Sequence, residues 1–185
     1  MMGSGKVILV TGGSRSGKSS FAEELLKDED DVLYIATSIV TDEEMEDRVK
    51  KHRERRNPLW ETYEGYLDLD KAVENSNKKY ILLDCVTIMT TNIMFKDEKD
   101  LEEISMEEVD KITESIKHEF DKLISKVREE DKTIVMVTNE VGLGVVPAYK
   151  IGRIFRDTAG FVNQHIGKKA DEIYLVCCGQ PMKIK

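Results

Sequence analysis

The sequence has little of several residue types that identify particular protein classes. Its 185 residues include three cysteines, three prolines and one tryptophan, and only 6% are aromatic. Cys85 and the adjacent Cys177 and Cys178 are too few, and wrongly spaced, for a disulfide framework or a zinc cluster. We expect free thiols in a reducing cytoplasm, with the side chains of Cys177 and Cys178 on opposite faces of a strand.

Long apolar runs and an excess of positive charge are also missing. No run approaches the roughly 20 apolar residues that cross a bilayer, and Met1–Gly5 is not a signal peptide. Lys and Arg total 28 against 36 Asp and Glu, a formal net charge of −8, which excludes a generally basic nucleic-acid coat. The 40% hydrophobic content is enough for a core. We therefore expect one domain over residues 1–185, with no nucleic-acid partner and no membrane span.

Five short apolar runs rich in β-branched residues predict strands that are buried on both faces. Such strands are typical of a parallel sheet covered by helices. The runs are Lys6–Thr11, Val32–Ala36, Tyr80–Cys85, Thr133–Thr138 and Glu172–Cys178. The turn signal Gly179-Gln180-Pro181 comes before Met182–Lys185, which predicts an antiparallel hairpin at the sheet edge.

A long amphipathic helix is predicted from about Glu102 to Glu130. Its apolar residues recur at steps of three and four, which places them on one face of a helix. They are Met106, Val109, Ile112, Ile116, Phe120, Leu123 and Val127. Strands and helices alternate without a repeat or a linker. The predicted fold is therefore α/β, with a mostly parallel central sheet flanked by helices and a C-terminal edge hairpin.

A phosphate-binding loop is the clearest motif. Residues 12–19 read GGSRSGKS and match G-x-x-x-x-G-K-[ST] between a predicted strand and a predicted helix, Ser19–Leu26, which is the context the motif requires. In such loops the backbone N–H groups surround phosphate oxygens, Lys18 places a positive charge at the β/γ-phosphates, and the Ser19 hydroxyl can ligate Mg²⁺. The motif predicts a P-loop NTPase-like fold. The other interpretation is a glycine-rich turn that matches by chance.

Asp84 is the candidate carboxylate for the metal site. It ends the apolar strand that begins at Tyr80, where the Walker B aspartate of a P-loop protein lies and faces bound Mg²⁺. The alternative is that Asp84 caps a turn or the following helix. Ser19 and Asp84 are the predicted metal ligands.

Residues 42–57 combine a histidine with concentrated positive charge. Arg48–Arg56 holds six cationic residues against one glutamate, a net charge of +5. His52 continues the helical face formed by Met45 and Val49. Two interpretations stay open. Either His52 is a core-edge histidine beside a solvated charged face, or the cations bind nucleotide phosphates and keep His52 neutral and nucleophilic.

Three stretches together resemble one enzyme family. They are Val10–Ser19, Tyr34–Trp60 with DEEMEDRVKKHRERR, and Val137–Gly179 with NEVGLG and FRD. Over essentially its whole length the chain resembles the bifunctional adenosylcobinamide kinase/adenosylcobinamide-phosphate guanylyltransferases of cobalamin biosynthesis. The adjacent cysteines Cys177 and Cys178 depart from the aliphatic residues usual in that family.

The resemblance implies two reactions. ATP or GTP would phosphorylate the aminopropanol hydroxyl of adenosylcobinamide. GTP would then guanylylate a histidine, which passes GMP to adenosylcobinamide phosphate and gives adenosylcobinamide-GDP. By motif, this histidine maps to His52, and Lys18 is the second catalytic residue. The resemblance also implies a homo-oligomer, namely a trimer. The implied nucleotide-contacting residues are Gly12, Gly13, Ser14, Arg15, Ser16, Gly17, Lys18, Ser19, Thr37, Ser38, Ile39, Arg53, Glu54, Arg55, Arg56, Glu64 and Asp84.

The run Thr138–Gly144 leaves the C-terminal end of a predicted strand, where ligands of open α/β sheets bind. We expect this run to border the corrinoid pocket or a subunit interface, together with polar residues of the next helix. Those residues are Arg153, Arg156, Asn163 and Gln164. An ordinary loop and surface helix fit the same residue types.

Two other functions stay open from the sequence. One is a monofunctional P-loop kinase for a small metabolite, in which His52 is structural. The other is a nucleotide-gated nucleic-acid binder, which the net acidity of the chain disfavours.

Overall fold

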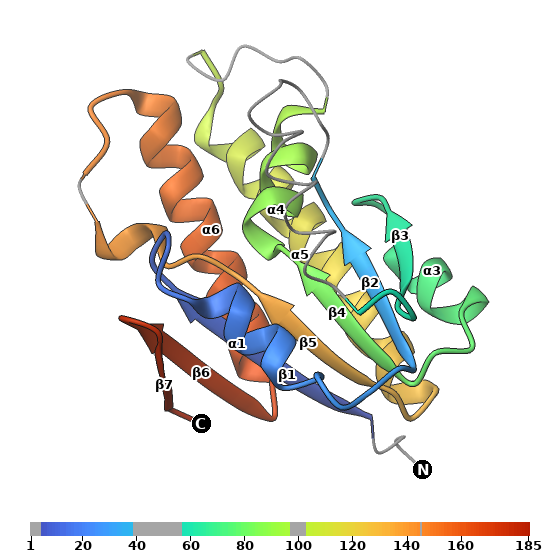
Figure 1. Ribbon diagram of the computed structural model, residues 1–185. Coiled ribbons are helices and arrows are strands. Elements are labelled where there is room, and N and C mark those ends of the chain that lie inside the picture. The colour runs from blue at the N-terminus through green and yellow to red at the C-terminus, as the bar shows by residue number, and fades with distance from the viewer. Residues whose placement is uncertain (1–4, 39–56, 97–102, 145) are drawn as a thin grey trace.

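A seven-stranded sheet forms the centre of the computed structural model, which describes residues 5–38, 57–96, 103–144 and 146–185 (Figure 1). The strands are β1 (Lys6–Gly12), β2 (Val32–Ala36), β3 (Glu61–Glu64), β4 (Tyr80–Asp84), β5 (Thr133–Val137), β6 (Glu172–Cys177) and β7 (Gln180–Lys183). Their order across the sheet is β3-β2-β4-β5-β1-β6-β7. Neighbouring strands are parallel except β6 and β7, which are antiparallel. The predicted α/β fold with a mostly parallel sheet is confirmed.

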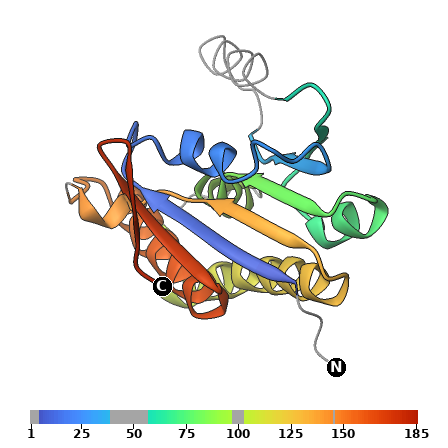
Figure 2. The ribbon, with the colours of Figure 1, turned by 60° about the horizontal axis from the view of Figure 1, so that its bottom comes forward.

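The helices cover both faces of this sheet. They are α1 (Lys18–Glu24), α3 (Leu69–Asn75), α4 (Val86–Phe95), α5 (Met106–Glu129), the 3-10 turn η1 (Val141–Leu143) and α6 (Lys150–Lys169). Helix α1 lies on one face, and α5 and α6 lie on the other (Figure 2). The described helices are too short or too polar to cross a membrane.

Two cores lie on opposite faces of the sheet because successive strand residues point to opposite sides. In β1, Val7 and Leu9 belong to the core under α3, α4, α5 and α6, whereas Ile8 and Val10 belong to the core under α1. All four side chains are buried. The near-continuous apolar runs of the sequence thus follow from a sheet that is covered on both faces.

The five predicted strands are confirmed as β1, β2, β4, β5 and β6, with ends that differ by at most one residue. Strand β3 was not predicted. Its sequence is ETYE, all four residues are exposed, and among the described strands it pairs with β2 alone, at the edge of the sheet. An exposed edge strand needs no apolar face, so no hydrophobic pattern marks it.

Helix α5 confirms the predicted amphipathic helix but begins at Met106. Ser105 caps it, accepting a hydrogen bond from the Glu108 backbone N–H while the Glu108 side chain accepts one from the Ser105 N–H. This capping box satisfies backbone donors that would otherwise lack partners. The assignment of Met106 to the buried face is wrong, because its side chain lies in the first turn and is 64% exposed.

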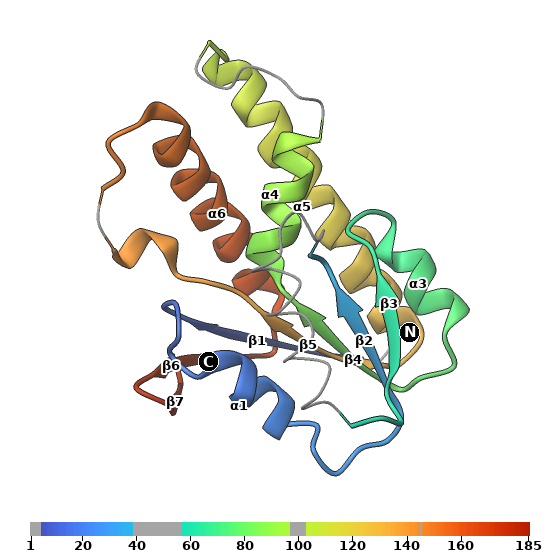
Figure 3. The ribbon, with the colours of Figure 1, turned by 45° about the horizontal axis from the view of Figure 1, so that its top comes forward.

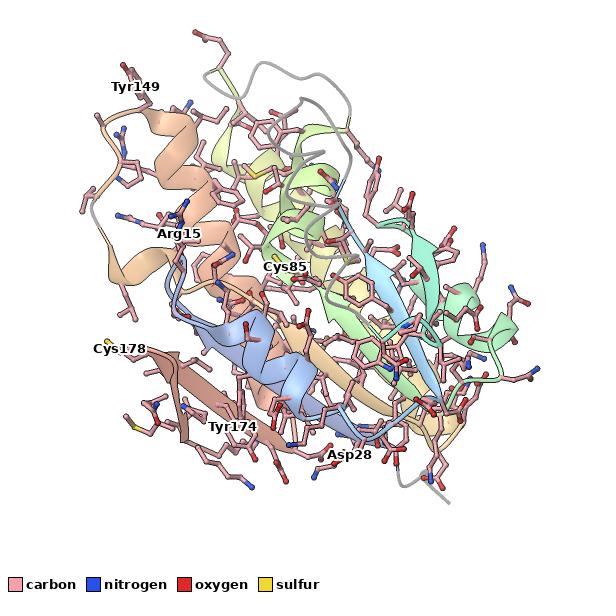
Figure 4. All side chains as sticks on the ribbon, in the orientation of Figure 1. Arg15, Asp28, Cys85, Tyr149, Tyr174 and Cys178 are labelled. Atoms are coloured by element: carbon pink, nitrogen blue, oxygen red, sulfur yellow. The ribbon has the colours of Figure 1, made fainter. Side chains whose placement is uncertain are left out.

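The predicted C-terminal hairpin is confirmed as β6 and β7. The turn lies at Cys178 and Gly179, both at positive φ, and β7 begins at Gln180. Cys178 is therefore a turn residue, and its Sγ lies 3.9 Å from that of Cys177. The expectation that the two thiols point to opposite faces of a strand is wrong for this reason. Both cysteines are free and exposed, as is Cys178 at the tip of the hairpin in Figure 4.

Candidate nucleotide-binding site

The phosphate-binding motif forms the loop between β1 and α1. Gly17 adopts φ 96° at the N-cap of α1, a conformation that favours glycine. At Gly12, an added Cβ would lie 2.5 Å from the Val176 carbonyl oxygen, so only glycine fits there. The backbone N–H of Gly179 donates to the Ser16 carbonyl at 2.8 Å and joins the loop to the β6–β7 turn.

Lys18 is the first residue of α1 and is only 9% exposed. Its Nζ donates to the carbonyl oxygen of Gly13 at 3.1 Å, which bends the side chain back across the loop. This hydrogen bond holds the ammonium group at the loop. Fixed positive charge next to a helix N-terminus is the setting that a phosphate group requires.

A cavity of about 670 Å³ opens at the loop, which is within the usual size range of small-molecule sites. It lies at the C-terminal edge of the sheet, toward which Figure 3 is turned. Its lining combines the loop, the ends of three strands, and η1. The lining residues are Gly13, Ser14, Lys18, Ser19, Tyr34, Ala36, Ser38, Asp84, Cys85, Ile88, Val137, Asn139, Glu140, Val141, Leu143 and Gly144.

Asp84 and Ser19 line this cavity from the end of β4 and the first turn of α1. The Tyr34 hydroxyl donates to Asp84 Oδ2 at 2.8 Å and orients the carboxylate. Cys85, not Asp84, is the N-cap of α4, because its Sγ accepts from the Ile88 N–H at 3.4 Å. The alternative role of Asp84 as a cap of that helix is therefore wrong.

The donor set fits Mg²⁺ held jointly with a nucleotide. A carboxylate and a hydroxyl from Asp84 and Ser19 are hard oxygen donors, and Mg²⁺ usually takes one or two carboxylates together with substrate phosphates. Among the described residues, no group of three or more His, Cys, Asp or Glu side chains could hold a metal ion alone. The site thus suits a metal that arrives with phosphates.

The other predicted nucleotide-contacting residues differ in where they lie: some line or support the cavity, some are exposed, and some fall outside the described residues. Ser38 lines the cavity, whereas Thr37 is buried, and its hydroxyl both donates to the Cys85 carbonyl and accepts from the Cys85 N–H at 2.9 Å. Thr37 thereby ties the end of β2 to the end of β4. Glu64 is exposed at the end of β3, paired in register with Ala36. Arg15 is exposed on the loop (Figure 4). Ile39, His52, Arg53, Glu54, Arg55 and Arg56 lie outside the described residues.

The run Thr138–Gly144 contributes to the same cavity as the phosphate loop. We expected a ligand pocket or a subunit interface beside this run because it follows the C-terminal end of a strand. Of the polar residues expected beside it, Arg153 donates to the Pro147 carbonyl, Arg156 pairs with Asp157, and Gln164 is exposed. Asn163 is buried and bonds to Glu140. None of these four α6 residues lines the cavity described above.

Cys85 also lines the cavity, but its chemistry is that of an inert thiol. Burial raises the pKa of the Cys85 thiol to about 11, and the neighbouring Asp84 carboxylate adds to the rise. The thiol is protonated at neutral pH, and only the thiolate is a strong nucleophile. Cys85 therefore contributes packing and the helix cap.

Two solved structures have a fold similar to that of the chain, with low sequence identity. The crystal structure of the KaiC-like protein PH0186 from Pyrococcus horikoshii OT3 has a TM-score of 0.48 and 12% identity, over 93% of this chain and 72% of that one. The crystal structure of the RadB recombinase has a TM-score of 0.44 and 13% identity, over 94% of this chain and 75% of that one.

Sequence relatives cover nearly the whole chain. The bifunctional adenosylcobalamin biosynthesis protein CobU of Escherichia coli K12 is 43% identical over 184 residues, which are 97% of this chain and 99% of that protein. CobP of Pseudomonas aeruginosa, also named a bifunctional adenosylcobalamin biosynthesis protein, is 33% identical over 96% of both chains. The model of one protein family matches residues 8–184. The chain belongs to the cobinamide kinase / cobinamide phosphate guanyltransferase family.

Proposed function

We propose that the chain is a bifunctional transferase. It phosphorylates the hydroxyl of adenosylcobinamide with ATP or GTP and then transfers GMP from GTP, through a guanylyl group on His52, to adenosylcobinamide phosphate. The observation that carries the proposal is the cavity shared by Lys18, Ser19 and Asp84, in a chain 43% identical to a bifunctional CobU over 97% of its length.

The kinase reaction needs positioning and charge neutralisation more than covalent chemistry. The loop N–H groups and Lys18 surround the β- and γ-phosphates and stabilise the charge that develops as the γ-phosphoryl group leaves. Ser19 and Asp84 would hold Mg²⁺, which neutralises phosphate charge when bound. Tyr34 supports this arrangement because its hydroxyl fixes the orientation of Asp84.

The guanylyl transfer needs a different nucleophile, because the attacked atom is the α-phosphorus. A phosphate loop surrounds the terminal phosphates and offers no group that attacks the α-phosphorus. The protonated thiol of Cys85 does not supply one either. A neutral imidazole at His52, within a segment of net charge +5, has the lone pair and the anion-binding surroundings that the step requires.

The substrate is a corrinoid, the enzyme acts in the cytoplasm as a homotrimer, and nucleic acid is not a partner. The family resemblance supports the substrate and the trimer. The net charge of −8 supports the exclusion of nucleic acid.

The test is covalent labelling by GTP carrying its label on the α-phosphate, with Mg²⁺ present. We expect denatured wild-type protein to retain the label in an acid-labile, base-stable N–P bond. His52→Ala should lose the label but keep adenosylcobinamide phosphorylation, because γ-phosphoryl transfer depends on Lys18, Ser19 and Asp84. His118→Ala, at an exposed position on α5, is the matched control and should label normally.

Three results would contradict the proposal. Acid-labile label on His52→Ala would move the nucleophile elsewhere. Corrinoid phosphorylation without label on wild-type protein would leave a monofunctional kinase with a structural His52. Steeply salt-dependent binding of a polynucleotide at low salt would favour the nucleic-acid alternative.

A further inference from the structure

Glu140 occupies the point of the cavity between the phosphate loop and the metal-binding carboxylate. It follows β5, which lies between β1 and β4 in the sheet. Strand β1 ends at the loop and β4 ends at Asp84. The Glu140 N–H donates to the Gly12 carbonyl at 3.2 Å, so its backbone is anchored to the start of the loop. Glu140 lines the cavity together with Lys18 and Asp84.

Two neutral donors hold the carboxylate of Glu140 by one oxygen. Oε1 accepts from the Thr11 hydroxyl at 3.1 Å and from the Asn163 amide at 3.3 Å. Both donors belong to buried residues, 5% and 9% exposed. Within the described parts of the chain, no Lys, Arg or His pairs with this carboxylate, and Oε2 accepts no hydrogen bond. The carboxylate is thus oriented, and no cation among the residues that the structure describes neutralises it.

The donor Asn163 is itself held by buried contacts. Its Oδ1 accepts from the Thr138 hydroxyl at 2.7 Å, and its Nδ2 also donates to the Asn139 carbonyl at 3.0 Å. The Thr138 hydroxyl lies 3.2 Å from that of Thr87 on α4. Buried polar networks in which every member is bonded restrict side chains to one arrangement. This network connects α4, the two residues that follow β5, and α6, and it ends at Glu140.

An alcohol that attacks phosphorus must lose its proton, and a carboxylate within hydrogen-bond reach is the group that accepts it. We propose that Glu140 is the general base of the kinase reaction and that Thr11 and Asn163 are its positioning residues. This inference rests on the proposed function, because it concerns the hydroxyl of the corrinoid substrate.

The substrate oxygen forms a bond to the γ-phosphorus while its O–H bond breaks and the proton passes to Oε2 of Glu140. The bond from the γ-phosphorus to the bridging oxygen breaks, and the nucleoside diphosphate leaves with that electron pair. Release of the proton to solvent restores the carboxylate. Attack by a neutral imidazole uses a lone pair already present, so guanylylation does not need this base.

Glu140→Gln tests the inference because it keeps the shape of the side chain but cannot accept the proton. We expect kcat for adenosylcobinamide phosphorylation to fall about 10²- to 10⁴-fold, the usual contribution of a general base. The KM for nucleotide should change by no more than about twofold, as expected when transition-state stabilisation alone is lost. Labelling by α-labelled GTP should stay at the wild-type level. Glu114→Gln, on the exposed side of α5, is the charge-matched control.

Asn163→Ala separates positioning from stability. It should lower kcat in wild-type protein but cause no further loss in the Glu140→Gln background, because both changes remove the same function. A merely structural Asn163 would instead lower kinase and labelling rates alike, in both backgrounds, and would overturn its positioning role.

Kinase activity of Glu140→Gln at the wild-type rate would overturn the inference, as would full recovery at raised Mg²⁺, which would indicate a metal-binding role. Should the Gln variant fail to fold, Glu140→Asp keeps the charge and should show a smaller fall in kcat. A wild-type enzyme that does not phosphorylate adenosylcobinamide would refute the proposed function instead. The same variants would then be compared in γ-phosphate hydrolysis, where water needs the same base, and equal rates would refute the role of Glu140.

Discussion

At the scale of single residues, the candidate site depends on backbone positions that only glycine can fill and on one lysine beside them. A side chain at Gly12 would contact the Val176 carbonyl, and Gly17 holds a positive φ. Lys18 then lies over the loop with its Nζ on the Gly13 carbonyl. The proposed phosphate site therefore combines a backbone shape with a positive charge, and a substitution can remove either feature separately.

Removal of the charge is the simpler experiment. We expect Lys18→Ala to fold but to lose most triphosphate binding and at least the kinase reaction, because a cation at the β/γ-phosphates stabilises the transition state by about 3 kcal/mol. Titration calorimetry with nucleotide and a corrinoid phosphorylation assay measure the two effects. Lys111→Ala, with a side chain 71% exposed on α5, is the control. Normal corrinoid phosphorylation by Lys18→Ala would refute the assignment of the phosphate loop.

At the scale of elements, the β6–β7 hairpin is tied to its neighbours at both ends. Its turn donates from Gly179 to the Ser16 carbonyl of the phosphate loop. At its base, Glu172 accepts from Lys6 of β1 at 2.7 Å, from the Tyr174 hydroxyl at 2.7 Å and from Lys183 of β7 at 3.2 Å. The hydrogen bonds from Lys6 and Tyr174 lower the pKa of the Glu172 carboxyl to about 2.

This low pKa makes the hairpin contribution depend on pH. A carboxyl with a lower pKa in the folded state stabilises that state above its unfolded pKa of about 4.3, and the stabilisation is lost as pH falls toward the folded value. The lysine side chains are about half exposed, so we expect Glu172→Gln to cost only about 1 kcal/mol at pH 7. Urea unfolding should show this difference in the free energy of unfolding between wild type and Glu172→Gln at pH 7. At pH 3 the difference should be smaller. A constant difference would contradict the pKa argument.

At the scale of the whole molecule, the larger core joins four helices to one face of the sheet. Helix α5 contributes Ile116, Phe120, Leu123, Ile124 and Val127 to it, all less than 5% exposed. Helices α3, α4 and α6 also pack into this core. Strands β2, β4 and β5 and helix α4, which carry several of the cavity residues, are thus held by this common apolar interior.

Phe120→Ala should test this interior. Phe120 is fully buried, and loss of a buried Phe ring costs about 3–5 kcal/mol because the cavity left behind collapses only in part. Phe161→Ala on α6 is the matched control, since its ring is 53% exposed, and we expect a cost below about 1 kcal/mol. The free energies of unfolding come from denaturant titration. Equal costs for both variants would show that α5 does not organise the core.

Local patterns in the sequence determined most of the framework. Strands β1, β2, β4, β5 and β6 were predictable because strands covered on both faces must be apolar at nearly every position. Helix α5 was predictable from its 3.6-residue period, and the phosphate loop from glycines and a lysine that lie within eight residues. In each case the requirement, an apolar pattern or a short motif, concerns residues that are close together in the chain. The sequence therefore shows it directly.

Only the tertiary structure decided the contacts between distant residues. Thr11, Glu140 and Asn163 form one network although 129 positions separate the first two, and their residue types do not reveal it. The exposed edge strand β3 and the turn position of Cys178 were likewise not predictable, because strand pairing and backbone φ determine them without an apolar pattern. The order of the strands, with β5 inserted between β1 and β4, brings Glu140 beside the phosphate loop and Asp84, because parallel strands end at the same edge of the sheet.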